Sequence, residues 1–103
     1  MKIQFNTDKT IDWDKRHDDH FTSVIIDELE RFRDHITRVE VHLSDENGAK
    51  EGVDDIRCLM EARMEGRKPI AVTNKANSAE LAIDGAITKI NTSVRTIVDK
   101  MRN

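Results

Sequence analysis

Residues 21–43 read FTSVIIDELERFRDHITRVEVHL, and the spacing of their apolar side chains changes once along this stretch. In the first part the apolar residues recur at steps of three and four, which predicts a helix with one buried stripe: Phe21, Ile25, Leu29, Phe32 and Ile36. In the second part they alternate with polar residues, which predicts a half-buried strand with Val39, Val41 and Leu43 inward. The chain therefore combines helix and strand within one short unit.

The same two spacings place the other elements. Alternation predicts a first strand over 2–6, a third over 56–64 and a fourth that starts at Ile70 and Val72, with a tight turn at 65–68. Asn47-Gly48 is a turn dipeptide between the second and third strands. Either Asp14 or Asp18 caps the first helix, and Ser78 is the expected N-cap of the last one. The apolar stripe of the last helix consists of Leu81, Ile83, Ile87, Ile90, Val94, Ile97, Val98 and Met101.

The resulting order is β-α-β-β-β-α, and each element has one apolar side. Helices and strands of this kind bury their apolar sides against each other, so we expect both helices to cover one face of a four-stranded sheet. The other sheet face should be in contact with water. The predicted fold class is a two-layer α+β sandwich.

Length and composition limit the function classes. The chain has 103 residues, so we expect one domain over 1–103. No window is apolar enough for a membrane span and the N-terminus lacks a secretory signal, so we expect a soluble cytoplasmic protein. Cys58 is the only cysteine, lies on an inward strand position and is interpreted as a core residue. An internal disulfide is therefore excluded.

Charge is distributed unevenly, although the net charge is only -3. Residues 14–36 hold seven acidic and four basic side chains. Residues 56–75 hold five basic and two acidic ones, and residues 89–103 hold four basic and one acidic. The N-terminal part of the chain is acidic and the C-terminal part is basic, so we expect an anionic partner to bind the C-terminal part.

Motifs for catalysis are scarce. His17-Asp18-Asp19-His20 is the one candidate metal cluster, and we interpret its side chains as solvated. No phosphate-binding glycine-rich loop and no nucleophile with a paired base occur, so we predict no catalytic residue, no cofactor, no small-molecule substrate and no enzyme activity. Trp13 is interpreted as a lid over the edge of the core.

The polar face of the last helix is more informative. Projected as a helix, the side opposite the apolar stripe carries small, hydroxyl-bearing or lysine residues: Ser78, Gly85, Lys89, Thr92, Ser93, Thr96 and Lys100. Hydroxyls can donate to phosphate oxygens and lysines supply charge, so this face fits contacts to a sugar-phosphate chain. A solvated face with few acids fits equally well.

Gly85 is expected on this exposed face, although glycine inside a helix costs about 0.5 to 1 kcal/mol relative to alanine. Two explanations are open: close approach of a nucleic-acid backbone, or tolerance at an exposed site. Tolerance predicts that Gly85→Ala raises stability by about 0.5 to 1 kcal/mol.

The stretches FRDHITRVEVHL, LAIDGAITKI and VDKMR, with the β-α-β-β-β-α order, resemble the ribosome hibernation promoting factor family, also known as the ribosome-associated inhibitor protein Y or sigma modulation protein family. The resemblance covers essentially the whole chain and implies a double-stranded-RNA-binding-domain-like fold. The chain is similar to the short form, which lacks a C-terminal dimerising domain.

The resemblance implies a ribosome-associated translation inhibitor. Such a protein binds small-subunit rRNA in the mRNA/tRNA channel and stabilises idle ribosomes under stress. Lys89, Lys100 and Arg102 match family positions and are expected to contact rRNA phosphates, and local charge adds Arg95, Arg67, Lys68 and Lys75, with Gly85 as the site of close approach. The chain departs from the family pattern at Ile25 and Glu28, at Thr92 and Thr96, and at Ser78-Ala79-Glu80.

A second hypothesis belongs to another class. A diverged paralogue could keep the fold but act as a protein–protein interaction module without ribosome binding, using its acidic first helix or its wet sheet face. Leu59, apolar on the polar side of its strand, hints at such a contact or at a dimer. Enrichment of one basic protein without rRNA would favour this hypothesis.

Overall fold

Two-residue alternation along the chain produces four strands that hydrogen-bond in the order β1-β2-β3-β4. The computed structural model describes residues 1–46 and 55–101. β1 pairs parallel with β2, and the other two pairings are antiparallel. The strand bounds are β1 Lys2–Thr7, β2 Ile36–Asp45, β3 Ile56–Met64 and β4 Ile70–Ala76.

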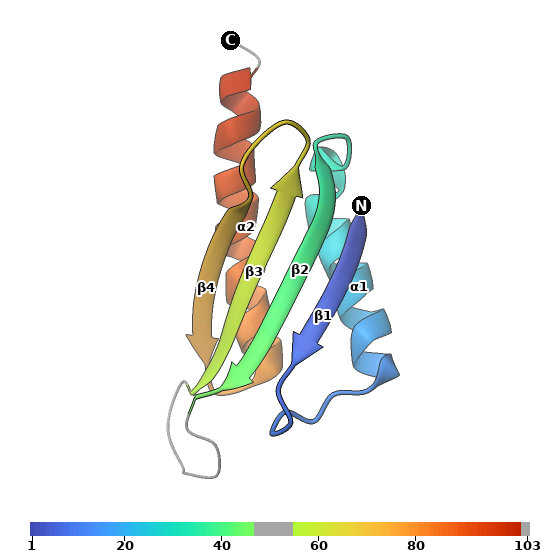
Figure 1. Cartoon of the computed structure of the whole chain (residues 1–103), viewed down its shortest axis with the longest axis vertical. Helices are drawn as coiled ribbons and strands as arrows, with labels where there is room; N and C mark the ends of the chain where they lie inside the picture. Colours follow the sequence, from blue (N-terminus) through green and yellow to red (C-terminus); the bar gives the residue numbers. More distant parts are fainter. Residues whose placement is uncertain (47–54, 102–103) are drawn as a thin grey trace.

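Two helices, α1 (Lys15–Leu29) and α2 (Ala79–Met101), cover the same face of this sheet (Figure 1). This confirms the predicted α+β sandwich and its element order. Both helices run in the same direction along the long axis of the molecule, and no helix or strand of the described residues covers the opposite sheet face (Figure 1). Leu59 lies half-buried on that open face, across from His42 and Thr73 on the neighbouring strands.

Local polar contacts set where each helix begins. Asp14 is the N-cap of α1, because its carboxylate accepts from the backbone N–H groups of Arg16 at 2.9 Å and His17 at 3.2 Å. This resolves the choice between Asp14 and Asp18. Ser78 caps α2 as predicted, since its hydroxyl accepts from the N–H of Leu81 at 3.2 Å.

The predicted first helix is too long. α1 ends at Leu29, a short 3₁₀ turn follows over Glu30–Phe32, and Ile36 is the first residue of β2, where it pairs with Met64. The helix ends early because the chain turns tightly over residues 32–35, where the N–H of His35 donates to the carbonyl of Phe32 at 2.8 Å. The helical spacing of Ile36 is coincidental, because a buried strand residue and a buried helix residue face the same core.

The core lies between the sheet and the two helices and is built from most of the predicted apolar side chains. Leu81 and Met101 were predicted in the stripe of α2, but they lie near the two ends of this helix and are exposed. Its fully buried side chains include Ile25, Leu29, Val39, Val41, Met60, Ile83 and Ile90. Cys58 is also fully buried, and this burial raises the pKa of its thiol to about 12. Cys58 is therefore a core residue, as predicted.

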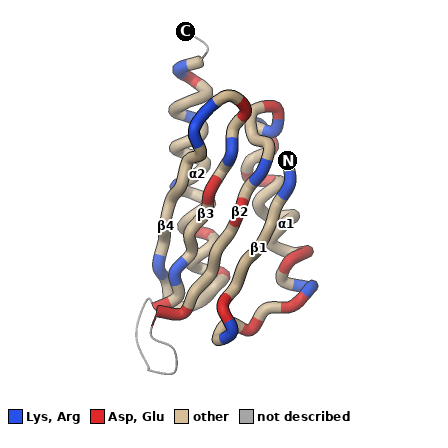
Figure 2. The backbone as a smooth tube through the Cα atoms, viewed as in Figure 1, with Lys and Arg blue, Asp and Glu red and all other residues tan. Residues whose placement is uncertain are grey.

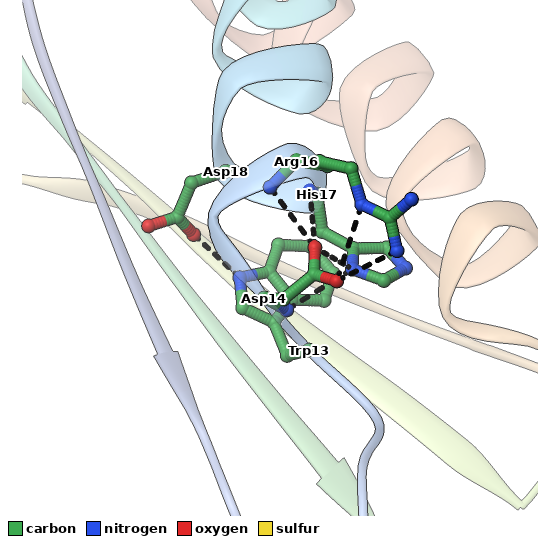
Figure 3. Close-up of polar contacts among 5 residues, drawn as sticks. All are labelled: Trp13, Asp14, Arg16, His17 and Asp18. Atoms are coloured by element: carbon green, nitrogen blue, oxygen red, sulfur yellow. Dashed lines mark hydrogen bonds and ion pairs between the residues drawn. The ribbon is translucent and has the colours of Figure 1, made fainter.

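Trp13 closes one edge of the core. Its ring stacks on Phe21 with centroids 5.5 Å apart and lies 5.2 Å from the ring of Phe5, and its indole N–H donates to Asp18 (Figure 3). The prediction of a lid is confirmed. Of the other predicted features, the turn at Asn47-Gly48 and the side chain of Arg102 lie outside the described residues.

Candidate nucleic-acid interface

The β3–β4 turn presents two of the predicted cations. Gly66 has a φ of 73°, which glycine adopts at little cost, and the N–H of Arg67 donates to the carbonyl of Met64 at 3.2 Å. Arg67 and Lys68 are both exposed. The turn lies at the same end of the long axis as the C-terminal end of α2, which carries the exposed Lys100 (Figures 1 and 2). We call this the hairpin end of the molecule.

A row of basic residues crosses the open sheet face near the same end. Strand register places Lys2 beside Arg38 and Arg38 beside Arg63. This row was not predicted from the sequence because its members come from three separate strands, although the outward positions of each strand were a signal. The guanidinium of Arg63 lies 3.1 Å from Glu61 and 3.6 Å from Glu40. Carboxylates therefore neutralise part of the row.

Arg38 is held within this row by two neighbours. Its guanidinium donates to the side-chain carbonyl of Gln4 and lies 3.0 Å from a carboxylate oxygen of Glu40. The two carboxylate oxygens of Glu40 thus contact different arginines, Arg38 and Arg63. Arg38 is therefore fixed on the sheet surface by its contacts, whereas Arg67 and Lys68 in the β3–β4 turn are exposed.

Lys75 does not join the hairpin end. It lies near the end of β4 at the opposite end of the long axis (Figure 1), and its ammonium is 3.6 Å from a carboxylate oxygen of Glu46. The same carboxylate lies 3.8 Å from Arg57. The positive segment that the sequence defines over 56–75 is thus divided between the two ends of the structure.

Lys89 lies against the edge of the sheet. Its ammonium donates to the backbone carbonyl of Thr73 in β4 at 2.7 Å. β4 is an edge strand, so Lys89 contacts the strand at the rim of the sheet. A phosphate group can still approach the exposed ammonium, but Lys89 is held to the flank of α2 that faces β4.

Gly85 lies on the same flank, and here the expectation of an exposed position is wrong. A Cβ atom at residue 85 would lie 2.0 Å from Nδ2 and 2.5 Å from Cγ of Asn74. The Asn74 amide passes over Gly85 and donates to the carbonyl of Ala82 at 3.2 Å. Close approach does explain the glycine, but the group that approaches is a side chain of β4. Tolerance at an open site is excluded.

The threonine hydroxyls of α2 are also used differently from the expectation. Thr92 donates to the carbonyl of Thr88 at 3.1 Å, and Thr96 donates to the carbonyl of Thr92 at 3.0 Å. A hydroxyl that donates its hydrogen to the preceding turn does not donate it to a phosphate oxygen. The exposed positive charge on this helix comes from Lys89, Arg95 and Lys100.

The His17–His20 cluster is organised as a helix start. The Nδ1 atom of His17 lies 3.1 Å from the backbone nitrogen of Asp14 and 3.0 Å from its carboxylate, and the imidazole stacks on Trp13 at 5.0 Å (Figure 3). Hydrogen bonds from Arg16, and then from the backbone of His17, lower the pKa of Asp14 to about 2. In the part of the chain that the structure describes, no three His, Cys, Asp or Glu side chains are grouped to hold a metal ion.

Within residues 1–46 and 55–101, none of the helices has the length and apolar character needed to cross a membrane.

Comparison with known proteins gives a family match. Residues 7–102 match the model of the family described as sigma 54 modulation protein / S30EA ribosomal protein. No curated protein matches the sequence.

Two solved structures share the fold at low sequence identity. The Protein Y N-terminal domain of Thermus thermophilus has 19% identity and a TM-score of 0.72, over 94% of this chain and 99% of that one. A ribosomal subunit interface protein from Coxiella burnetii has 14% identity and a TM-score of 0.69, over 96% and 99%.

Proposed function

The chain belongs to the sigma 54 modulation protein / S30EA ribosomal protein family, and from this premise we propose that it is a ribosome-associated translation inhibitor. It binds small-subunit rRNA in the channel for mRNA and tRNA, and it stabilises idle ribosomes under stress. Two findings support the proposal. The family name refers to a ribosomal protein, and a protein with the same fold is described as a ribosomal subunit interface protein.

The observation that carries the proposal is the group of exposed cations at the hairpin end. Arg67 and Lys68 are exposed in the β3–β4 turn, and Lys100 lies in the last turn of α2 at the same end (Figure 2). None of the three has an ion pair among the described residues. Cations without a competing carboxylate are the ones that bind phosphates and release counterions.

The predicted contact residues differ in how well they fit this role. Arg67, Lys68 and Lys100 form the centre of the proposed surface, and Arg95 extends it along α2. Lys89 is a flanking contact. We leave Lys75 out because Glu46 pairs with it at the far end, and Gly85 out because Asn74 covers it.

The first test measures ribosome binding against salt concentration. The double variant Arg67→Glu/Lys68→Glu is compared with Lys9→Glu/Lys15→Glu, which makes the same charge change at exposed positions away from the hairpin end. We expect the wild-type chain to co-sediment with small subunits at low salt and to dissociate as salt rises. The hairpin variant should bind more weakly, and its salt slope should fall by roughly 0.7 to 0.9 for each phosphate that the variant no longer neutralises.

Equal weakening in both variants would show that the hairpin end is not the contact surface. Absence of wild-type binding at any salt concentration would refute ribosome association altogether.

The second test addresses the channel. Small subunits are first filled with mRNA and tRNA and then offered the chain. Occupied subunits should bind much less of the chain than empty ones, and the chain should inhibit translation in a purified system. If occupied and empty subunits bind equally, the site lies outside the channel.

A further inference from the structure

A groove runs along the seam between α1 and α2, on the side of the helices that faces away from the sheet. The two helices run in the same direction, and the side-chain amide of Asn91 in α2 donates to the carbonyl of Glu28 in α1 at 2.9 Å. This hydrogen bond joins the helices near the end of α1. From that point toward the helix starts, the surface between them is hollowed.

Two hollows follow each other along this seam. The larger measures about 370 Å³ and is lined by Asp12, Arg16, His17, His20, Phe21, Ala79 and Glu80. The smaller measures about 200 Å³ and is lined by Val24, Glu28, Asp84, Ile87 and Thr88. On each helix the second set follows the first by about one turn, as from Glu80 to Asp84, so the two hollows are neighbours along the seam, and we refer to them together as the groove.

The floor of this groove is apolar and its rims are acidic. Phe21 and Ile87 are core residues that reach the surface here, and Val24 and Ala79 are half-buried beside them. The carboxylates of the rims are exposed and come from three segments: Asp12, Glu28, Glu80 and Asp84. The guanidinium of Arg16, the one lysine or arginine among the lining residues, is 3.1 Å from the carboxylate of Asp14.

Such a surface disfavours nucleic acid. Four carboxylates around a narrow groove repel phosphate groups, while they attract lysine and arginine side chains. The apolar floor offers contacts to aliphatic side chains between those cations. The acidic rims and the apolar floor thus fit the same occupant, a polypeptide segment that has both basic and aliphatic side chains.

We propose that the groove between α1 and α2 is a docking site for a basic segment of a partner protein. Lysine or arginine residues of that segment pair with Glu28, Glu80 and Asp84, and its apolar side chains cover Phe21 and Ile87. The site lies on the helices and uses none of the cations of the hairpin end.

The length of the groove limits the size of the segment. Between Ala79 and Thr88 the axis of α2 advances by about 14 Å, at 1.5 Å per residue. A strand rises by about 3.3 Å per residue, so roughly four extended residues fill the groove. Contact areas this small belong to transient interactions, and we expect micromolar affinity or weaker.

The test uses a short fluorescein-labelled peptide that alternates lysine and leucine, and fluorescence anisotropy with the purified chain. The groove variant is Glu28→Gln/Asp84→Asn. The control is Glu65→Gln/Asp99→Asn, which removes the same charge from exposed positions outside the groove. We expect about tenfold weaker binding by the groove variant, consistent with the removal of two exposed ion pairs, and less than a twofold change in the control.

Equal weakening in both variants, or absence of binding by the wild-type chain, would overturn the proposal. Amide NMR shifts identify the surface used: the peptide should shift residues of α1 and α2 along the groove. Labelled oligouridylate serves as the second probe. If it shifts the same amides, the groove is a nucleic-acid site and the proposal of a protein partner is wrong.

Discussion

Replacing Gly85 with alanine is the substitution for which sequence and structure predict opposite results. Alanine is favoured over glycine within a helix by about 0.5 to 1 kcal/mol. At this position, however, the new Cβ would lie 2.0 Å from Nδ2 of Asn74, so the Asn74 side chain must move. It then gives up its hydrogen bonds to the carbonyls of Ala82 at 3.2 Å and Leu81 at 3.4 Å.

The magnitudes favour destabilisation. Each hydrogen bond contributes about 0.5 to 1.5 kcal/mol, so the loss of both costs about 1 to 3 kcal/mol. Against the helix-propensity gain, we expect Gly85→Ala to lower the free energy of unfolding by about 1 kcal/mol. In a chain that already carries Asn74→Ala, the amide is absent, and the same change should be neutral or stabilising by about 0.5 kcal/mol.

The assay is urea unfolding of the four chains of this double-mutant cycle, followed by the fluorescence of Trp13, the only tryptophan. A coupling free energy of about 1 to 1.5 kcal/mol between residues 85 and 74 is expected, within the range for residues in contact. As control, Thr96→Ala on the exposed part of α2 should have the same effect with and without Asn74. If Gly85→Ala stabilises both backgrounds equally, the contact with Asn74 does not explain the glycine.

Three further predictions concern the helix start and the core. The stabilisation by Asp14 is complete above its ordinary pKa near 3.8 and is lost as pH falls toward about 2. In urea unfolding, the difference in the free energy of unfolding between wild type and Asp14→Asn should therefore shrink over that pH range. Cys58, with its pKa raised to about 12 by burial, should not react with a thiol reagent at pH 8 until denaturant is added; rapid reaction of the native chain would contradict its burial. Ile83→Val should cost about 0.5 to 1.5 kcal/mol in urea unfolding, whereas Leu81→Ala, at a side chain 53% exposed, should change stability by less than about 0.5 kcal/mol.

Much of the fold could be predicted because the apolar residues of each element recur at the spacing of a helix or of a strand. The structure confirms the alternation over 56–64 and most of the predicted stripe of α2, but Leu81 and Met101 are exposed, and Ala82 and Ala86 are buried in the core. Ile36 shows where this reasoning fails. Its spacing fits a helix, and the 3₁₀ turn that ends the helix at Leu29 has no strong signal in residues 30–35.

The candidate site was less predictable because it depends on distances between elements. Lys75 and Lys68 are close in sequence, yet an extended strand carries them to opposite ends of the molecule. Gly85 falls opposite the apolar stripe in a helical projection. That projection cannot show that an edge strand brings Asn74 over the helix flank. Nor does it show that the hydroxyls of Thr92 and Thr96 are used within the helix.

The contact between Lys89 and Thr73 has a consequence for the behaviour of the free protein in concentrated solution. An exposed edge strand offers unpaired backbone groups to the edge of another molecule, which is a common route to aggregation. The ammonium of Lys89 binds a backbone carbonyl of β4 and puts a positive charge beside this edge strand. Approach of a second β4 edge would bring two such charges together and would have to displace both. We therefore expect Lys89 to disfavour edge-to-edge association through β4.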